Sequence, residues 1–223
     1  MAKKIALIIG GCGHRDGAEI TEAVSLIISL SEGNAQTQAF APQIDFHPIN
    51  HLTGIQDEKS FRNSLEEAGR IMRGKVKDLV QLNAKDFDGM AIAGGTGMAT
   101  VVSDWAKHGS KCQVHAELQR VIEDFHREGK PILAVCIAPA LVARVLGTRH
   151  GGKSRIIVTL GDATQDIQEL LKTGVEHEIC PSDDFISDRD SKIISTPAYM
   201  NKATPAQIFQ GIRLACRELV ELA

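Results

Sequence analysis

Cys136 is the side chain of this sequence with the clearest potential for nucleophilic chemistry. It follows the apolar run PILAV (131–135), which is typical of a buried strand, and it precedes a predicted helix over 137–146. A thiol at a helix N-terminus lies near unpaired N–H groups and the positive end of the helix dipole, and both stabilise a thiolate. The small neighbours Ala134 and Ala138 permit a sharp turn from strand to helix. We therefore expect a strained backbone at Cys136 and a thiol pKa below its ordinary value of about 8.5.

A buried, chemically inert cysteine is the alternative interpretation of this position, and the local sequence does not decide between the two. The sequence has five cysteines, an odd number, and none of them forms a CxxC pair. This pattern favours neither a disulfide framework nor a zinc ribbon.

Two other groups of residues suggest a bound cofactor, but neither has a complete motif. The segment GGCGHRDG departs by one residue from the dinucleotide fingerprint, and the second predicted strand ends in FAP (40–42) without the acidic residue that holds a ribose. Glycines for a tight turn are the favoured interpretation. His47 and His51 are four residues apart, but Pro48 between them argues against a helical metal pair. We expect no metal and no cofactor.

Apolar runs and helical periodicities alternate along the chain. Predicted strands cover 4–9, 35–41, 90–93, 131–135 and 156–160, and 185–186 and 193–194 flank a predicted hairpin turn. Predicted helices lie between residues 20 and 33, 61 and 74, 114 and 129, 137 and 146, 167 and 174, and 208 and 222. This alternation predicts an α/β fold. We expect one domain, 1–223, with a mostly parallel sheet that has helices on both faces.

Ligand sites in such sheets form at the carboxyl ends of the strands, where GGCGHRDGAE, AGGTG and VCIAPA fall in this sequence. The first helix is marked by apolar residues at helical spacing, Ile20, Val24, Ile27 and Ile28. The segment 43–59 has no clean period and is longer than an ordinary connection. We expect it to form an ordered excursion that packs over the mouth of a pocket or contributes to a homodimer interface.

Composition limits the partners and the compartment. The formal net charge is −3, which gives no general reason to bind nucleic acid or an anionic membrane. The apolar run near the N-terminus is too short for a signal peptide, and no segment approaches the length of a membrane span. We expect a cytoplasmic protein.

The segments GGCGHRDGAEI, INHLTG, AGGTG, VCIAPA and STPAYM, in this order and at these intervals, closely resemble the ElbB family. That family was once linked to isoprenoid biosynthesis and belongs to the ThiJ/PfpI class I glutamine amidotransferase-like superfamily. The resemblance spans nearly the whole chain, and the combination of segments is specific although each alone is weak. It implies a flavodoxin-like three-layer sandwich.

The resemblance also implies roles for individual residues. Cys136 is the expected nucleophile, and Glu19 is the carboxyl group expected against its sulfur. The backbone N–H groups of Gly95 and Ile137 are the expected oxyanion hole. Without the resemblance, an acid that complements the dipole at the start of a helix is the favoured interpretation of Glu19.

The sequence departs from the wider superfamily at the elbow. Ile137 follows the cysteine where many relatives of the PfpI branch have histidine, and the turn is not the GxCxG of true glutaminases. No Cys-His-Glu triad can be assembled from neighbouring positions, and His14 and His51 are the candidate histidines that could support the pocket from their loops. These departures disfavour amidase and protease activity.

The activity that the resemblance implies is that of a cofactor-independent glyoxalase, a lyase that converts glyoxal to glycolate through a cysteine hemithioacetal. The expected partners are a small aldehyde and a second copy of the chain. A non-catalytic protein in which Cys136 senses oxidants is the alternative. A glutaminase-like subunit that needs a synthase partner is the third hypothesis.

Overall fold

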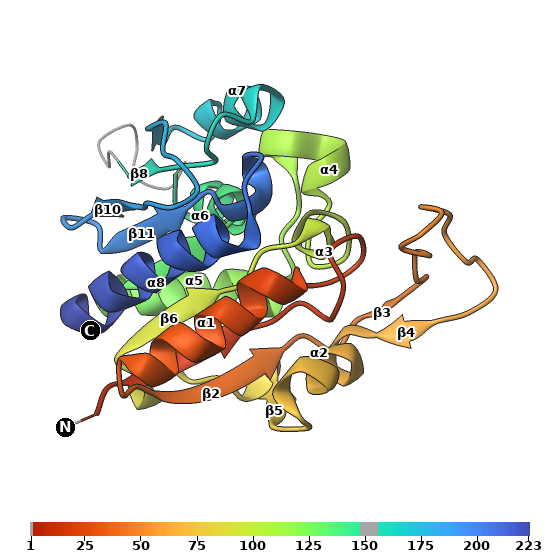
Figure 1. Cartoon of the computed structure of the whole chain (residues 1–223), viewed down its shortest axis with the longest axis horizontal. Helices are drawn as coiled ribbons and strands as arrows, with labels where there is room; N and C mark the ends of the chain where they lie inside the picture. The colour runs from red at the N-terminus through yellow and green to blue at the C-terminus, as the bar shows by residue number, and fades with distance from the viewer. Residues whose placement is uncertain (1, 148–155) are drawn as a thin grey trace.

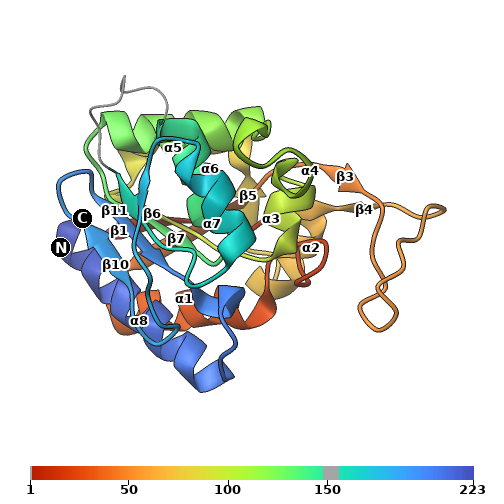
Figure 2. The same ribbon diagram turned by 90° about the horizontal axis from the view of Figure 1, so that it is seen from above.

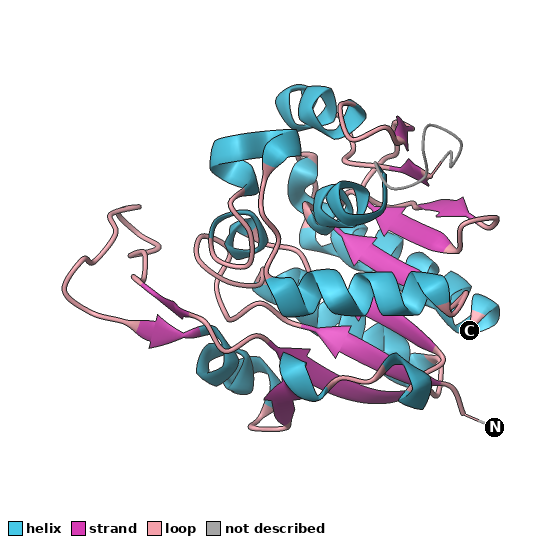
Figure 3. Ribbon diagram, turned by 180° about the vertical axis from the view of Figure 1, so that it is seen from behind, coloured by secondary structure: helices cyan, strands magenta, loops and turns pink. Residues whose placement is uncertain are grey.

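Seven strands form one central sheet in the computed structural model, which describes residues 2–147 and 156–223. In spatial order they are β10 (Ile186–Asp188), β11 (Ile193–Thr196), β7 (Ile132–Val135), β6 (Gly89–Ile92), β1 (Lys4–Ile8), β2 (Gln36–Ala41) and β5 (Val76–Asp78). All neighbouring pairs are parallel except β10 with β11. The arrowheads of the central strands point toward the same end of the sheet (Figure 3).

Helices cover both faces of this sheet. The helices of the described chain are α1 (Ile20–Glu32), α2 (Ser64–Met72), α3 (Thr96–Thr100), α4 (Trp105–His108), α5 (Ala116–Arg127), α6 (Ala138–Leu146), α7 (Thr164–Leu171) and α8 (Pro205–Leu222). Figure 2 shows α1 and α8 on one side of β1, β6 and β7 and α5 on the other side. The α/β fold with three layers is confirmed.

The central strands are apolar because both of their faces are covered. Every residue of β6, β7 and β11 is buried, and in β1 only Lys4 is exposed. Continuous apolar runs of this kind are typical of parallel sheets between two helical layers. The core therefore lies along β1, β6 and β7, and the turns that follow these strands are held by rigid elements.

The sequence predictions agree with the structure in part. The hairpin of β10 and β11 is confirmed. The strand expected over 156–160 forms only β8 (Ile157–Val158), which pairs with β9 (Glu176–His177) outside the central sheet. The second helix begins at Ser64, because the side chain of Asn63 caps it there.

An arm, defined here as residues 47–61, extends away from the rest of the chain between β3 (Asp45–Phe46) and β4 (Arg62–Asn63) (Figure 1). The arm carries three exposed apolar side chains, Leu52, Ile55 and Phe61. Its base is held by Asp16, whose Oδ2 accepts the backbone N–H of Ile49 at 2.6 Å. The expected excursion is therefore present.

No helix in the described part of the chain is long and apolar enough to cross a membrane.

Candidate functional site

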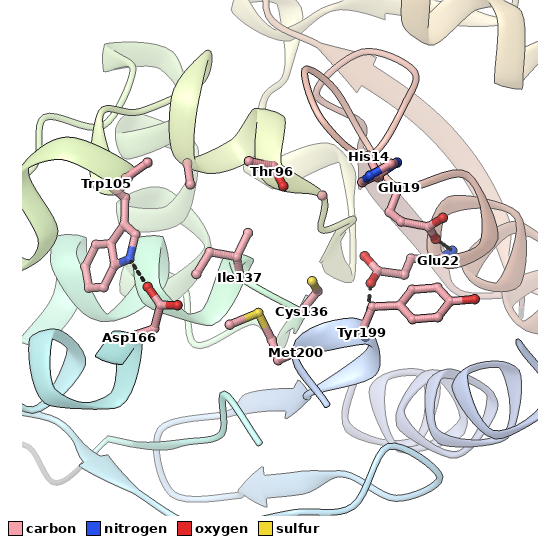
Figure 4. Close-up of a pocket in the computed structure, with 13 residues that line it drawn as sticks. His14, Glu19, Glu22, Thr96, Trp105, Cys136, Ile137, Asp166, Tyr199 and Met200 are labelled. Carbon is pink, nitrogen blue, oxygen red and sulfur yellow. Dashed lines mark hydrogen bonds between the residues drawn. The ribbon is translucent and has the colours of Figure 1, made fainter. Parts of the chain in front are cut away.

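A pocket of about 550 Å³ lies at the carboxyl ends of four adjacent strands, β11, β7, β6 and β1. Each of these strands is followed by a turn that contributes to the lining (Figure 4). The lining residues are His14, Glu19, Glu22, Gly95, Thr96, Ala99, Trp105, Ala106, Cys136, Ile137, Asp166, Tyr199 and Met200. The pocket is thus at the place where open parallel sheets bind ligands.

Cys136 occupies a strained turn between β7 and α6. Its φ is +61°, a left-handed conformation that costs a non-glycine residue on the order of 1–3 kcal/mol. The backbone N–H of Cys136 donates to the carbonyl of Thr196 at 2.9 Å, which ties the turn to β11. The side chain is 7% exposed and lines the pocket. The predicted strain is confirmed, although α6 begins at Ala138, one residue later than expected.

Two backbone N–H groups donate to the sulfur of Cys136, those of Gly95 and Ile137. Gly95 has a φ of +107°, a conformation that side-chain-bearing residues rarely adopt. The neighbouring Gly94 has to lack a side chain for another reason, since a Cβ there would lie 2.4 Å from the Cβ of Cys136. The glycines of AGGTG therefore let β6 approach the elbow closely and direct an N–H at the sulfur.

Glu22, on α1, is the carboxyl group that interacts with the Cys136 sulfur. Its side chain is fully buried and lies beside the thiol, so that each group shifts the pKa of the other. Its Oε1 accepts the backbone N–H of Tyr199 at 3.4 Å, and among the described residues no hydrogen-bond donor of good geometry faces Oε2. Burial, and then the charge of Glu19, raise the pKa of Glu22 to about 8. A protonated Oε2 that donates to the sulfur fits this environment.

Glu19 lines the same pocket but has a different position from the one expected. Its Oε2 accepts the backbone N–H of Glu22 at 2.8 Å, so the side chain caps the N-terminus of α1. The structure thus places Glu22, one helical turn further, at the sulfur where we expected Glu19. Glu22 lies on the buried face of α1, whereas Glu19 is the N-cap residue of that helix and is held there by its own capping bond.

The pKa of the Cys136 thiol is raised well above its ordinary value, which corrects the expectation of a readily ionised cysteine. Burial is the largest cause, and the charge of Glu22 is the second. The N–H groups of Gly95 and Ile137 lower the pKa but do not outweigh these effects. A thiolate at this position consequently needs a base that takes its proton during the reaction.

Of the two histidines singled out in the sequence, His14 lines the pocket, and His51 contacts His14 from outside the lining. His14 lines the pocket, and its carbonyl accepts the N–H of Thr96 at 2.7 Å. The ring of His51 lies 5.0 Å from the ring of His14 in an edge-on arrangement and is not among the lining residues. Because His51 belongs to the arm, this contact joins the base of the arm to the pocket wall.

The wall opposite Glu22 contains two residues that the sequence reasoning did not single out, Trp105 and Asp166. Trp105 and Asp166 lie together there, with Ile137 and Met200 between them and the elbow (Figure 4). Asp166 comes from α7, so no local pattern connects it with the tryptophan. Met200 is part of the STPAYM segment, but its role in the lining depends on the turn after β11.

Among the described residues, no group of three or more His, Cys, Asp or Glu side chains is arranged to hold a metal ion.

Comparison with known proteins shows what the chain is similar to. No family model matches it. It is 36% identical to the human "Glutamine amidotransferase-like class 1 domain-containing protein 3, mitochondrial", over 99% of this chain and 84% of the human protein. The crystal structure of an "isoprenoid biosynthesis protein with amidotransferase-like domain" from Ehrlichia chaffeensis has a TM-score of 0.88 and 31% identity, and covers 98% of this chain and 99% of its own.

Glyoxalase III from Candida albicans shares the fold at a TM-score of 0.61 but only 13% identity, over 99% of this chain and 97% of its own. The fold and these relatives define the class of protein, the class I glutamine amidotransferase-like superfamily. Within it, the chain belongs to the family of isoprenoid-biosynthesis-associated, amidotransferase-like proteins, the ElbB family.

Proposed function

We propose that this protein is a cofactor-independent glyoxalase that converts glyoxal to glycolate. The observation that carries the proposal is the contact of the buried Glu22 carboxyl with the Cys136 sulfur inside a pocket open to a small molecule. The similarity of the fold to that of glyoxalase III also supports this proposal. The chemistry combines a nucleophile, an acid–base group and backbone donors.

In the first step, the Cys136 sulfur adds to one aldehyde carbon of glyoxal. The S–C bond forms while the S–H proton passes to the Glu22 carboxylate, and Glu22 then delivers that proton to the former carbonyl oxygen. The product is a hemithioacetal. The N–H groups of Gly95 and Ile137, which donate to the sulfur before the reaction, lie where negative charge moves from sulfur to oxygen.

In the second step, the Glu22 carboxylate removes the carbon-bound proton, and the electron pair forms an enediol with the neighbouring carbonyl. Return of the proton to the second carbon gives a thioester of glycolate. Water then cleaves the thioester, and glycolate and the free thiol are released. One carbon is oxidised and the other reduced, so the reaction requires only water as a co-reactant.

The redox-sensor alternative is less well supported by this site. Oxidants react with the thiolate form of cysteine, and burial together with Glu22 raises the pKa of Cys136. Addition to an aldehyde avoids this difficulty, because Glu22 takes the proton as the bond forms.

The glutaminase-like alternative needs a group that holds the α-carboxylate of glutamine. The described residues that line the pocket include no lysine or arginine. An amidotransferase pocket without a cation has no charge-assisted partner for that carboxylate.

Steady-state turnover of glyoxal by the purified protein tests the proposal. We expect glycolate to accumulate over many turnovers, and we expect the Cys136→Ala variant to form none while it keeps the wild-type circular dichroism spectrum. Modification of Cys136 by hydrogen peroxide without any glyoxal turnover would support the sensor instead. Release of ammonia from glutamine would support the glutaminase-like hypothesis.

We propose a small aldehyde and a second copy of this chain as the partners. The exposed Leu52, Ile55 and Phe61 of the arm offer an apolar surface for the second copy. The cytoplasmic compartment expected from the sequence stays a prediction. The name of the human relative includes the word mitochondrial. Cell fractionation can decide whether the present protein lies in the cytoplasm or in another compartment.

A further inference from the structure

The peptide unit between Ala198 and Tyr199 is held by hydrogen bonds on both of its sides. Its N–H donates to Oε1 of Glu22 at 3.4 Å (Figure 4), and its carbonyl accepts the hydroxyl of Ser182 at 2.8 Å. The carbonyl also accepts the N–H of Asn201 at 3.4 Å, within the same turn. Because a trans peptide unit is planar, its N–H and C=O point in opposite directions. A hydroxyl that fixes the carbonyl therefore also fixes the direction of the N–H.

The turn that contains this peptide unit has a disfavoured backbone conformation. Ala198 has a φ of +45°, in the left-handed region that residues with a side chain rarely adopt, and it is fully buried. Such a conformation persists only where the surrounding structure stabilises it. The bond from Ser182 is the shorter of the two to the Ala198 carbonyl, and it comes from a different segment, which precedes β10. Ser182 thus supports the turn from outside.

The hydrogen bond to Glu22 is sensitive to the position of this turn. At 3.4 Å it is near the longest distance at which an N–H and an oxygen still bond, so even a small displacement of Tyr199 would break it. Oε2 of Glu22 has no donor of good geometry among the described residues. A carbonyl that accepts a hydrogen bond also makes the N–H of its own peptide unit a stronger donor. The Ser182 hydroxyl therefore affects both the place and the strength of the N–H that Glu22 receives.

Ser182 itself is held firmly and lies outside the pocket at the elbow. It is 5% exposed, and a Cβ at Gly211 of α8 would lie 2.2 Å from its carbonyl oxygen. It is not among the residues that line the pocket, so it does not touch a molecule bound there. Any effect of Ser182 on the reaction has to pass through the peptide unit between Ala198 and Tyr199.

We propose that Ser182 is a positioning residue for the Glu22 carboxyl, because its hydroxyl orients the N–H of Tyr199 toward Oε1. This inference rests on the proposed function where it concerns turnover, and on the hydrogen bonds alone where it concerns Glu22. The N–H of Tyr199 lowers the pKa of Glu22, against the larger opposite effects of burial and of Glu19. Cys136 is the other titratable group that acts on this carboxyl. Loss of the Ser182 hydroxyl should therefore raise the pKa of Glu22 further.

The ¹³C resonance of the Glu22 carboxyl, assigned by its absence in Glu22→Gln, measures this pKa without catalysis. In Ser182→Ala, we expect the titration midpoint to lie about 0.4–1 pH unit above the wild-type value of about 8, the shift that one hydrogen bond supplies. Ser182→Thr keeps the hydroxyl and should keep the wild-type midpoint. An unchanged midpoint in Ser182→Ala would overturn the inference.

Ser64→Ala is the matched control for this titration. Ser64 is fully buried, and its hydroxyl likewise donates to a backbone carbonyl, that of Pro42. The variant therefore loses the same kind of bond without a change in the turn after β11, and its Glu22 midpoint should equal that of wild type. A shift in Ser64→Ala as large as that in Ser182→Ala would show a general effect of lost stability and would overturn the inference.

Kinetics separates this inference from the proposed function. With glyoxal, the pH midpoint of kcat/KM in Ser182→Ala should move upward by the same amount as the NMR midpoint, so kcat/KM at pH 7 should fall about three- to tenfold. An NMR midpoint that moves without any change in the kinetic profile would contradict Glu22 as the base and support its positioning by Ser182. Absence of turnover in the wild type contradicts the proposed function, while the NMR titration still decides whether Ser182 positions Glu22.

Discussion

The carboxyl of Glu22 lies against the sulfur of Cys136, while Glu19, three residues earlier, accepts the backbone N–H of Glu22. The two acids are therefore connected through one helical turn but have different environments. Glu22 is fully buried, and Glu19 stands at the helix end on the pocket surface. The raised pKa of Glu22 follows from this arrangement, because burial and the charge of Glu19 both disfavour its ionised form.

Stability should fall as pH rises through the range in which Glu22 holds its proton only in the folded state. An unfolded glutamate ionises near 4.5, whereas the folded-state pKa of Glu22 is about 8. Between these values the folded state binds one more proton, so the free energy of unfolding decreases with pH. Each pKa unit corresponds to about 1.4 kcal/mol, so the total decrease is at most about 4–5 kcal/mol.

The Glu22→Gln variant lacks this proton and should show a flatter pH dependence than wild type. Urea unfolding at pH 5, 7 and 8.5 measures the difference, and Glu66→Gln, at an exposed position on α2, serves as the control. Parallel curves for wild type and Glu22→Gln would contradict the assignment of a protonated Glu22.

Turnover of glyoxal should depend on both Cys136 and Glu22. Cys136→Ser and Cys136→Ala remove the nucleophile, and neither should form glycolate. Glu22→Gln keeps a hydrogen-bond donor beside the sulfur but removes the base, so kcat/KM should fall by about 10²–10⁴. Because the carboxylate is the active form, wild-type kcat/KM should rise with pH to a midpoint near the Glu22 pKa of about 8. A Glu22→Gln variant with wild-type kcat/KM would exclude Glu22 as the base.

Alkylation of the thiol gives an independent readout of the same pair. Burial and the Glu22 charge raise the pKa of Cys136, so the rate of reaction with iodoacetamide should increase only in alkaline solution. Removing the charge in Glu22→Gln should move this increase to lower pH. A shift in the opposite direction would show that Glu22 stabilises the thiolate.

The elbow could be predicted from the sequence, but its acidic partner could not. A five-residue apolar run that enters Cys136 directly requires a sharp turn, and the small neighbours permit it. The helix α1 is different, because Ile20, Val24 and Ile28 mark a helix by their spacing and yet are exposed. The buried face instead carries Glu22, Ala23, Leu26 and Leu30. Apolar periodicity thus indicated the helix correctly and its inner face incorrectly, so Glu22 was missed.

The far wall of the pocket had no sequence signal either. Trp105 and Asp166 are 61 positions apart, and only the packing of α7 beside α4 joins them. Local patterns predict which residues end strands and begin helices. They do not predict which side chains from separate connections meet.

Cys136 and Glu22 lie so close to Gly94 that even the methyl group of an alanine does not fit there. A Cβ there would lie 2.4 Å from the Cβ of Cys136 and 2.5 Å from Oε2 of Glu22. Gly94→Ala should therefore displace both groups, lower stability by about 1–3 kcal/mol as overpacking does, and abolish turnover. Gly33→Ala is the matched control, because its nearest contacts would be 3.5 Å and its φ is −77°. Thermal unfolding and glyoxal assays on both variants check this, and retained activity in Gly94→Ala would contradict the described geometry.

The arm should mediate association if it covers its apolar side chains with a second copy. Leu52 is 96% exposed and Ile55 is 68% exposed, which leaves both open to a partner. The double variant Leu52→Asp and Ile55→Asp should lower the mass measured by sedimentation from a dimer to a monomer. Ile179→Asp, at a position that is 79% exposed outside the arm, should leave the mass unchanged. A wild-type protein that sediments as a monomer at all concentrations would contradict the proposed homodimer.

Glu19 should affect stability as a helix cap and catalysis only through Glu22. Glu19→Ala removes the acceptor for the Glu22 N–H and should lower the free energy of unfolding by about 1 kcal/mol, whereas Glu19→Asp or Glu19→Ser should retain most of the cap. Glu19→Gln removes a charge that raises the pKa of Glu22, so the pH midpoint of kcat/KM should move below the wild-type value of about 8. At pH 7 a larger fraction of Glu22 is then ionised, so this variant should equal or exceed wild type in kcat/KM, whereas Glu22→Gln should lose about 10²–10⁴. A pH–rate profile of the two variants beside wild type measures both effects. A loss in Glu19→Gln as large as that in Glu22→Gln, with no shift of the midpoint, would return the role of base to Glu19.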